Sequence, residues 1–257
     1  MKVIAVMSPK GGIGKTTTAD SITHLLGTEQ GKKVLILEAD PQGDTSKTYG
    51  RYEPEGIGMS ELLEQHKKWG GIYETKDLIQ KTDYENIDII QGNGYLMKTD
   101  MELMMKTTEA NQVERISEAL KEIEYEYDYC ICDCGRLLDM VVINVMMAAD
   151  LIIAPVKIGG YEIEAIYNLS EQIQELREMN PRLRIKLLMT MRQKNKTTEE
   201  VEQWLRNESG IEMFETTIRR SVVVEKATMA LKPLPEFAKN CISTKDYREL
   251  VKELMEE

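Results

Sequence analysis

A short glycine-rich stretch near the amino terminus constrains this chain more than any other feature. The loop SPKGGIGKTTT, residues 8–18, lies between an apolar run at Val3–Met7 and a segment with helical spacing that begins near Lys15. Glycines at 11, 12 and 14 allow the backbone to point successive N–H groups at one phosphate. The positive end of the following helix faces the same anion. The order of strand, loop and helix therefore predicts a phosphate-binding loop.

Two side chains of this loop suit the same task. Lys15 supplies a charge for the β- and γ-phosphates, and the Thr16 hydroxyl suits a Mg²⁺ ligand. The general pattern GxxxxGK[ST] requires glycine where this chain has Pro9, so the chain matches KGGxGK[ST] instead, with a second lysine at Lys10. The alternative, a glycine-rich turn with two solvated lysines, does not need a strand before it and a helix after it. The residues expected to contact the nucleotide are Lys10, Gly11, Gly12, Ile13, Gly14, Lys15, Thr16 and Thr17.

The length and composition are those of a globular domain with its own core. The chain has 257 residues, of which 42% are hydrophobic and 30% are charged. Only a few apolar residues precede Pro9, which is too few for the core of a signal peptide. The longest apolar region, 140–156, contains Asn144 and Asp150 and is too short and too polar to span a membrane. We expect a cytoplasmic protein that does not contact a membrane.

Charge is distributed unevenly along the chain. The net charge of −11 argues against indiscriminate binding of nucleic acid. The segment 182–248 nevertheless carries 14 Lys and Arg against 9 Asp and Glu. This excess indicates either a basic surface on the last third of the protein or an ordinary solvated face.

The cysteines do not form a pattern typical of disulfides. Three of the four, Cys130, Cys132 and Cys134, alternate along one apparent strand, and the fourth is Cys241. Alternate residues of a strand point to the same face, which suits a packed core better than a metal cage. An iron–sulfur or redox role is the alternative, and no C-x-x-C motif supports it.

An acidic residue follows the second predicted strand. The apolar segment 33–39 runs into Asp40, and strand, loop, helix and strand together form a βαβ unit with parallel strands. Asp40 therefore lies at the same edge of the sheet as the phosphate loop, where a carboxylate can complete the Mg²⁺ shell or orient the attacking water. The alternative is that Asp40 only begins the turn D-P-x-G.

A second acidic residue ends a later strand. The segment 127–132 is predicted to be a buried strand that ends at Asp133. A carboxylate in that place would reach Mg²⁺ through water.

The remaining pattern alternates strands with helices. We expect further strands at 87–91, 151–156 and 185–190, and helices at 15–29, 59–66, 97–126, 161–179, from 197 onward and at 244–256. The expected fold class is α/β, a doubly wound and mostly parallel sheet with helices on both faces. The last helix has one apolar face and several glutamates, so we expect it to pack on the core rather than to anchor the protein to a membrane.

The motifs resemble those of one family. The loop with Lys10 resembles the deviant Walker A motif of the ParA/MinD ATPases, in which the extra lysine reaches the partner's nucleotide across a dimer interface. Residues 38–43, EADPQG, resemble the D-x-D-P-Q-G of that family, with Glu38 in place of its first aspartate. The strand that ends at Asp133 resembles a Walker B element. The resemblance extends from Met1 to about Leu254 and is closest to the ParA/Soj-type partition ATPases.

This resemblance implies a P-loop NTPase fold in a single domain, residues 1–257, without the N-terminal helix-turn-helix extension of some plasmid partition proteins. It also implies ATP and Mg²⁺ as cofactors. Lys10, Lys15 and Asp40 would be the catalytic residues. Thr16, Asp40 and Asp133 would serve the metal. The end of the strand at 185–190 would border the adenine, so 190–192 are candidates for base contacts.

The resemblance further implies a switch. Such an ATPase forms an ATP-dependent homodimer, binds DNA nonspecifically, hydrolyses ATP slowly until a ParB-like activator stimulates it, and partitions or positions chromosomal, plasmid or mobile-element DNA. DNA binding would associate the protein with the nucleoid. The candidate DNA contacts are Lys194, Lys196, Arg219 and Arg220.

The chain departs from the family pattern at two places in the active site. Glu38 has a longer side chain than aspartate, and Gly135-Arg136 stands where the family has two prolines.

Two other functions stay open. A positioning ATPase for a different cargo, in division, conjugation or secretion, would share the whole nucleotide site. An ATP-dependent synthetase on the related fold is the second alternative.

Overall fold

The computed structural model describes residues 1–64, 73–105, 112–158, 167–168, 171, 174–175 and 177–256. Most of the helix expected at 161–179 lies outside these residues. No helix of the described part is both long enough and apolar enough to cross a membrane.

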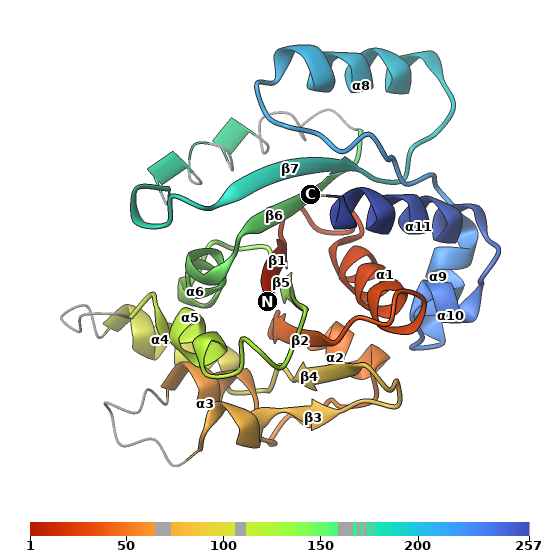
Figure 1. The fold of residues 1–257 in the computed structure, drawn as a ribbon. Helices are drawn as coiled ribbons and strands as arrows, with labels where there is room; N and C mark the ends of the chain where they lie inside the picture. Colours follow the sequence, from red (N-terminus) through yellow and green to blue (C-terminus); the bar gives the residue numbers. More distant parts are fainter. Residues whose placement is uncertain are drawn as a thin grey trace.

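A seven-stranded sheet in the order β3-β4-β2-β5-β1-β6-β7 forms the centre of the protein (Figure 1). All neighbouring strands pair in parallel except β3, which runs antiparallel to β4. The expected doubly wound, mostly parallel sheet is therefore confirmed. The strands are β1 (Lys2–Val6), β2 (Val34–Ala39), β3 (Gln80–Lys81), β4 (Ile87–Ile90), β5 (Tyr129–Cys134), β6 (Leu151–Val156) and β7 (Arg184–Met189).

Helices cover both faces of this sheet, as Figure 1 shows. Alternation along each strand sends side chains to two separate apolar clusters, for example Val3 and Ala5 to one and Ile4 and Val6 to the other. The first face is covered by α1 (Lys15–Thr28), α9 (Val222–Met229), α10 (Leu234–Phe237) and α11 (Ile242–Met255). The second is covered by α3 (Met59–Glu64), α4 (Leu96–Met105), α5 (Arg115–Lys121) and α6 (Met140–Ala148). Three further elements are α2 (Asp44–Thr48), the 3₁₀ helix η2 (Thr75–Leu78) and α8 (Lys196–Glu208).

Strand register brings the functional segments to one edge. Asp133 of β5 lies opposite Val6 of β1 on one side and opposite Glu38 of β2 on the other. The loops that follow these three strands therefore meet at the carboxyl edge of the sheet, where ligands of such folds bind.

Two packing predictions are confirmed. Cys130, Cys132 and Cys134 are fully buried in the same apolar cluster. In α11 the apolar face expected from the sequence is buried against α1 and the sheet, at Tyr247, Leu250, Val251 and Leu254.

Other boundaries differ from the prediction. The helical region expected at 97–126 contains two helices, α4 and α5, and residues 112–114 before α5 are not helical. A tertiary contact fixes the second start, since the Arg115 N–H donates to Asn144 Oδ1 at 3.0 Å. Helix α8 is capped by Asn195, whose side chain accepts from the Thr198 N–H, rather than by the threonines that open it.

Candidate functional site

The glycine-rich loop has the conformation that its glycines predict. Gly12 has φ 69° and Gly14 has φ 92°, both in the left-handed region that favours glycine. Gly14 is the N-terminal boundary residue of α1 and makes no side-chain capping bond. The N–H groups of the first turn of α1 therefore remain available to an anion.

Lys15 is held inside this loop. It is 8% exposed, and its Nζ donates to the Lys10 carbonyl oxygen at 3.1 Å. Burial lowers the pKa of Lys15, while the carboxylates of Asp133 and Asp40 oppose this shift. The loop thus places one ammonium group in the field of two acidic residues, as a phosphate-binding lysine requires.

Arg136 adds a cation that the sequence suggested only weakly. A Cβ atom built on Gly11 would lie 3.1 Å from Arg136 Nη1 and 3.2 Å from its Cδ, so the arginine lies directly against the loop. The charge of Arg136 also contributes to the lowered pKa of Lys15. The segment that replaces the two prolines therefore brings a guanidinium to the phosphate loop.

Asp133 presents an unsatisfied carboxylate oxygen to the same place. It is 1% exposed, its Oδ2 accepts from the Thr45 hydroxyl at 2.9 Å, and its Oδ1 has no hydrogen-bond partner among the described residues. Burial raises the pKa of Asp133 to about 7, and the nearby hydroxyl groups of Thr16 and Thr45 partly offset the shift. A buried acceptor next to the Thr16 hydroxyl fits the oxygen ligands and water shell of Mg²⁺.

Asp40 begins the turn that was the alternative explanation for it. Its Oδ1 accepts from the Gln42 N–H at 2.9 Å, and its carbonyl accepts from the Gly43 N–H at 3.0 Å, so it does begin the turn. The turn holds Asp40 at the carboxyl end of β2, near enough to Lys15 to oppose the lowering of that lysine's pKa.

Glu38 has a structural partner of its own. Its Oε2 accepts from the N–H and the hydroxyl of Ser46, at 2.7 and 3.2 Å. Burial raises the pKa of Glu38. The longer side chain therefore ties β2 to α2, and Glu38 Oε1 is a further buried oxygen without a partner among the described residues.

Asp20 and Thr45 were missed in the sequence. Asp20 lies one helical turn after Thr16 in α1, and its Oδ1 accepts from the Thr45 hydroxyl at 3.0 Å, the hydroxyl that also contacts Asp133. Burial raises the pKa of Asp20 well above its usual range. The apolar spacing of this helix gave no signal, because Asp20 is one residue from Ala19 and two from Ile22 and so lies on a different face.

A cavity of about 70 Å³ lies beside the loop, and it is lined by Ile13, Gly14, Thr17, Thr190 and Met191 together with residues of the 218–225 segment and Tyr247. The Thr190 hydroxyl donates to the Ile13 carbonyl at 2.7 Å, which joins the end of β7 to the loop. Two of the three residues expected near adenine line this cavity. The third, Arg192, donates through Nε to Glu202 Oε2 at 2.8 Å.

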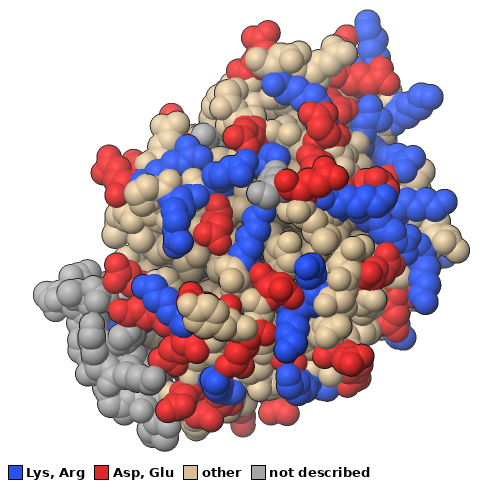
Figure 2. Space-filling model, in the orientation of Figure 1, with Lys and Arg blue, Asp and Glu red and all other residues tan. Residues whose placement is uncertain are grey.

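The four candidate DNA contacts have different surroundings. Arg219 forms an ion pair with Asp246 through its Nε and Nη2 groups, and Lys196 Nζ lies 3.5 Å from Glu200 Oε1. Lys194 and Arg220 are exposed and form no ion pair with other described residues. Figure 2 shows that Lys and Arg side chains gather along the right-hand edge of this view, where α8, α9 and α11 lie in Figure 1.

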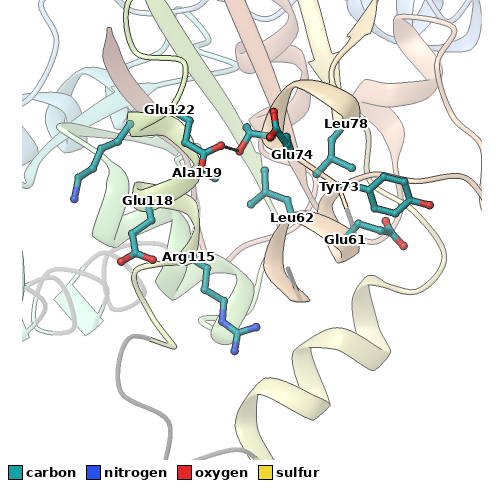
Figure 3. Close-up of a pocket in the computed structure, with 11 residues that line it drawn as sticks. Glu61, Leu62, Tyr73, Glu74, Leu78, Arg115, Glu118, Ala119 and Glu122 are labelled. Atoms are coloured by element: carbon teal, nitrogen blue, oxygen red, sulfur yellow. Dashed lines mark hydrogen bonds between the residues drawn. The ribbon is translucent and has the colours of Figure 1, made fainter. Parts of the chain in front are cut away.

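A larger cavity, about 270 Å³, lies between α3, η2 and α5, as Figure 3 shows. Its walls include the hydrogen bond from Thr75 Oγ1 to Glu122 Oε2, at 3.0 Å, and the buried Arg115. None of the residues proposed for nucleotide or metal lines this cavity.

Known proteins share this architecture. The chromosome partitioning protein ParA of Caulobacter vibrioides is 28% identical over 99% of this chain and 94% of its own length. The sporulation initiation inhibitor protein Soj of Bacillus subtilis is 28% identical over 98% of both chains. A cobyrinic acid a,c-diamide synthase from Mycobacterium smegmatis, solved with ADP and magnesium, has a TM-score of 0.82 at 24% identity and covers 99% of this chain and 94% of its own. Apo McdA from Cyanothece has a TM-score of 0.82 at 23% identity, with 99% of both chains covered.

A family model described as an AAA domain matches residues 1–185, which include the phosphate loop, Asp40 and Asp133. This match covers well over half of the chain and agrees with the two curated relatives. The chain therefore belongs to this AAA-domain family, as a ParA-type ATPase.

Proposed function

We propose that this protein is an ATP-dependent dimerising switch, which binds DNA nonspecifically and partitions or positions a DNA cargo. One observation carries the proposal. The loop that holds Lys10 and Lys15 lies close to Asp133, whose buried Oδ1 has no hydrogen-bond partner among the described residues. Names of the curated relatives support the partition role, since one is a chromosome partitioning protein.

The residues of the site have separate tasks in this proposal. Lys15 and the N–H groups at the start of α1 hold the β- and γ-phosphates. Thr16 and Asp133 would hold Mg²⁺, which neutralises charge on those phosphates when it is bound. Asp40 orients the attacking water, because a carboxylate that accepts one N–H through Oδ1 can still accept from water through its other oxygen.

Exposed apolar side chains next to the loop support a face-to-face dimer. Leu137, in the segment after Asp133, is 74% exposed. The exposed face of α4 carries Met97, Met101 and Met104. Helix α4 is joined to the same segment, because Asp100 Oδ1 accepts from the Met140 N–H at 2.8 Å. Burial of this surface against a second copy would stabilise a dimer in which Lys10 reaches the partner's nucleotide.

The basic edge supports DNA binding. Lys194 and Arg220 are the strongest candidates, since neither is neutralised by a described acidic neighbour. Lys196 and Arg219 must exchange an ion pair for a phosphate contact. Contacts of this kind are electrostatic, so binding should weaken steeply with salt. Bound to DNA, the protein would lie on the nucleoid.

The test is retention on immobilised, nonspecific DNA with ATP and with ADP. We expect retention with ATP, release with ADP, and loss of retention in the double variant Lys194→Ala/Arg220→Ala. Lys76→Ala/Lys121→Ala, at two exposed lysines of η2 and α5, is the control and should be retained like the wild type. Equal retention of the wild type with both nucleotides would contradict the switch, and no retention would favour a different cargo.

Hydrolysis should be slow in the isolated protein and faster with a ParB-like partner. A second candidate function comes from the fold likeness to a cobyrinic acid a,c-diamide synthase. Under that alternative, ATP cleavage would require a small carboxylic acid and an amide-nitrogen donor. Steady ATP turnover that depends on such an acceptor would replace the switch proposal.

A further inference from the structure

Two buried carboxyl groups share one hydroxyl directly beneath the proposed metal site. Asp20 of α1 is 6% exposed and Thr45 of α2 is 1% exposed. The Thr45 Oγ1 lies 3.0 Å from Asp20 Oδ1 and 2.9 Å from Asp133 Oδ2. One oxygen atom, Thr45 Oγ1, thus links α2 to the phosphate-loop helix α1 and to the end of β5.

This arrangement is costly as simple packing. Burying a carboxyl group is unfavourable unless its oxygens are hydrogen-bonded. The Asp20 side chain is buried, and the hydrogen bond to its carboxyl group comes from Thr45. A carboxyl group in this position is therefore better explained by what it does to Thr45 and Asp133.

The single proton of the Thr45 hydroxyl limits how the two hydrogen bonds can run from donor to acceptor. One hydroxyl carries one proton, so Thr45 can donate to only one of the two carboxyl groups at a time. When Thr45 donates to Asp133, its oxygen remains as an acceptor that faces Asp20. Asp20 Oδ1 lies 3.0 Å from that oxygen and can donate to it when the Asp20 carboxyl group carries a proton. The resulting order of hydrogen bonds runs from Asp20 through Thr45 to Asp133.

Asp133 is the last acceptor in this series of hydrogen bonds, and its two carboxylate oxygens differ. Its Oδ2 is fixed by Thr45, and its Oδ1 has no partner among the described residues. Groups that hydrogen-bond to a metal-binding carboxylate set its orientation and its basicity.

We propose that Asp20 and Thr45 are positioning residues, which hold the Asp133 carboxylate so that Oδ1 faces the hydration shell of the magnesium ion. The inference rests on the proposed magnesium site at Thr16 and Asp133. Neither Asp20 nor Thr45 needs to touch the nucleotide.

A brace between two helices is the competing explanation. The Asp20 carbonyl accepts from the Tyr49 hydroxyl at 3.2 Å, and the nearby Thr48 hydroxyl lowers the pKa of the Asp20 carboxyl, against the larger effect of burial. These contacts tie α1 to α2 whether or not metal is bound. The test must therefore read out the metal separately from the fold.

The experiment measures binding of a fluorescent ATP analogue, first in excess EDTA and then across a Mg²⁺ titration. Thr45→Val and Asp20→Leu remove the order of hydrogen bonds, whereas Thr45→Ser and Asp20→Asn keep a hydroxyl and a donor in place. We expect the first pair to need about tenfold more Mg²⁺ for half-maximal affinity, with unchanged affinity in EDTA. The second pair should behave like the wild type. Thr48→Val, which removes a hydroxyl near Asp20 but not near Asp133, is the matched control.

Two results would overturn the inference. One is a Mg²⁺ requirement of Thr45→Val that equals that of the wild type. The other is an equal loss of affinity with and without Mg²⁺ in both Thr45→Val and Thr48→Val, which a brace would produce. If the ATP affinity of the wild type does not respond to Mg²⁺, the proposed magnesium site itself is contradicted. This outcome differs from the two results that would overturn the inference about Asp20 and Thr45. Thermal unfolding of each variant verifies that it is folded.

Discussion

At the scale of single residues, charged side chains are concentrated around the phosphate loop and α2. Arg136 lies against Gly11, Glu38 reaches Ser46, and Asp20 contacts Thr45. Together with Asp133, two of these residues make three buried acids in contact with α2, and each of the three has its pKa raised by burial. An anionic nucleotide can bind there only with compensating cations, which makes Mg²⁺ and Arg136 important.

Arg136→Ala should weaken the affinity for ATP. A guanidinium that contacts phosphate makes charge-assisted hydrogen bonds, whose loss costs about 1.5 kcal/mol or roughly tenfold in affinity. Arg136→Lys should keep part of that affinity as a point charge. Titration calorimetry with ATP and Mg²⁺ provides the measurement, and Lys33→Ala, at an exposed lysine remote from the loop in sequence, is the control. Unchanged affinity in Arg136→Ala would assign the arginine to packing alone.

Asp133 should make the nucleotide-free protein less stable as pH rises. The folded state keeps the Asp133 proton to about pH 7, whereas an unfolded aspartate releases it near pH 4. Between these values unfolding releases a proton, so the free energy of unfolding falls with rising pH. Asp133→Asn should therefore be more stable than the wild type at pH 8, by roughly 2 kcal/mol, and the difference should shrink at pH 4.5. Urea denaturation at both pH values tests this, and a difference that does not depend on pH would contradict it.

At the scale of elements, α11 supports α1 from behind the phosphate loop. The Thr18 hydroxyl and the Tyr247 hydroxyl are 3.0 Å apart, and both side chains are buried. Glu253 of α11 also accepts the N–H groups of Glu215 and Thr216, at 2.8 and 3.0 Å. The last helix therefore fixes both the loop helix and the segment beside β7.

Tyr247→Phe and Thr18→Val should each destabilise the protein by about 1 kcal/mol. Each substitution removes one hydroxyl of the pair and leaves the other hydroxyl buried without its hydrogen-bond partner. The double variant should be destabilised by less than the sum, by about 0.5–1 kcal/mol, since its second change removes the orphaned group. Urea denaturation of the four proteins gives this coupling. Strict additivity would mean that the two hydroxyls do not interact.

The sequence predicts those elements correctly whose local residue pattern matches their surroundings in the folded protein. Buried strands such as β2 and β6 are continuous apolar runs, and the glycines of the loop match the φ values of Gly12 and Gly14. The separation of α4 from α5 depends on Asn144, which is distant in sequence. The link from Asp20 through Thr45 to Asp133 joins three separate segments, so no local pattern could reveal it.

At the scale of the whole molecule, the two charged regions have different partners in this account. The carboxyl edge of the sheet gathers the loop, Arg136 and the exposed Leu137, and in the proposed dimer it would face a second copy of the chain. The edge at α8, α9 and α11 carries Lys and Arg side chains (Figure 2), and in the proposal it would face DNA. A dimer doubles the basic surface, so nucleotide-dependent dimerisation and DNA binding should rise together.

The most direct test of this account is sedimentation of the wild type and Lys10→Ala, each saturated with Mg²⁺ and a non-hydrolysable ATP analogue. We predict a dimer for the wild type with the analogue, a monomer with ADP, and a monomer for Lys10→Ala with either nucleotide, although Lys10→Ala still binds the analogue. A Lys10→Ala protein that dimerises with the analogue as well as the wild type would contradict the central claim that Lys10 makes this phosphate loop a dimer switch.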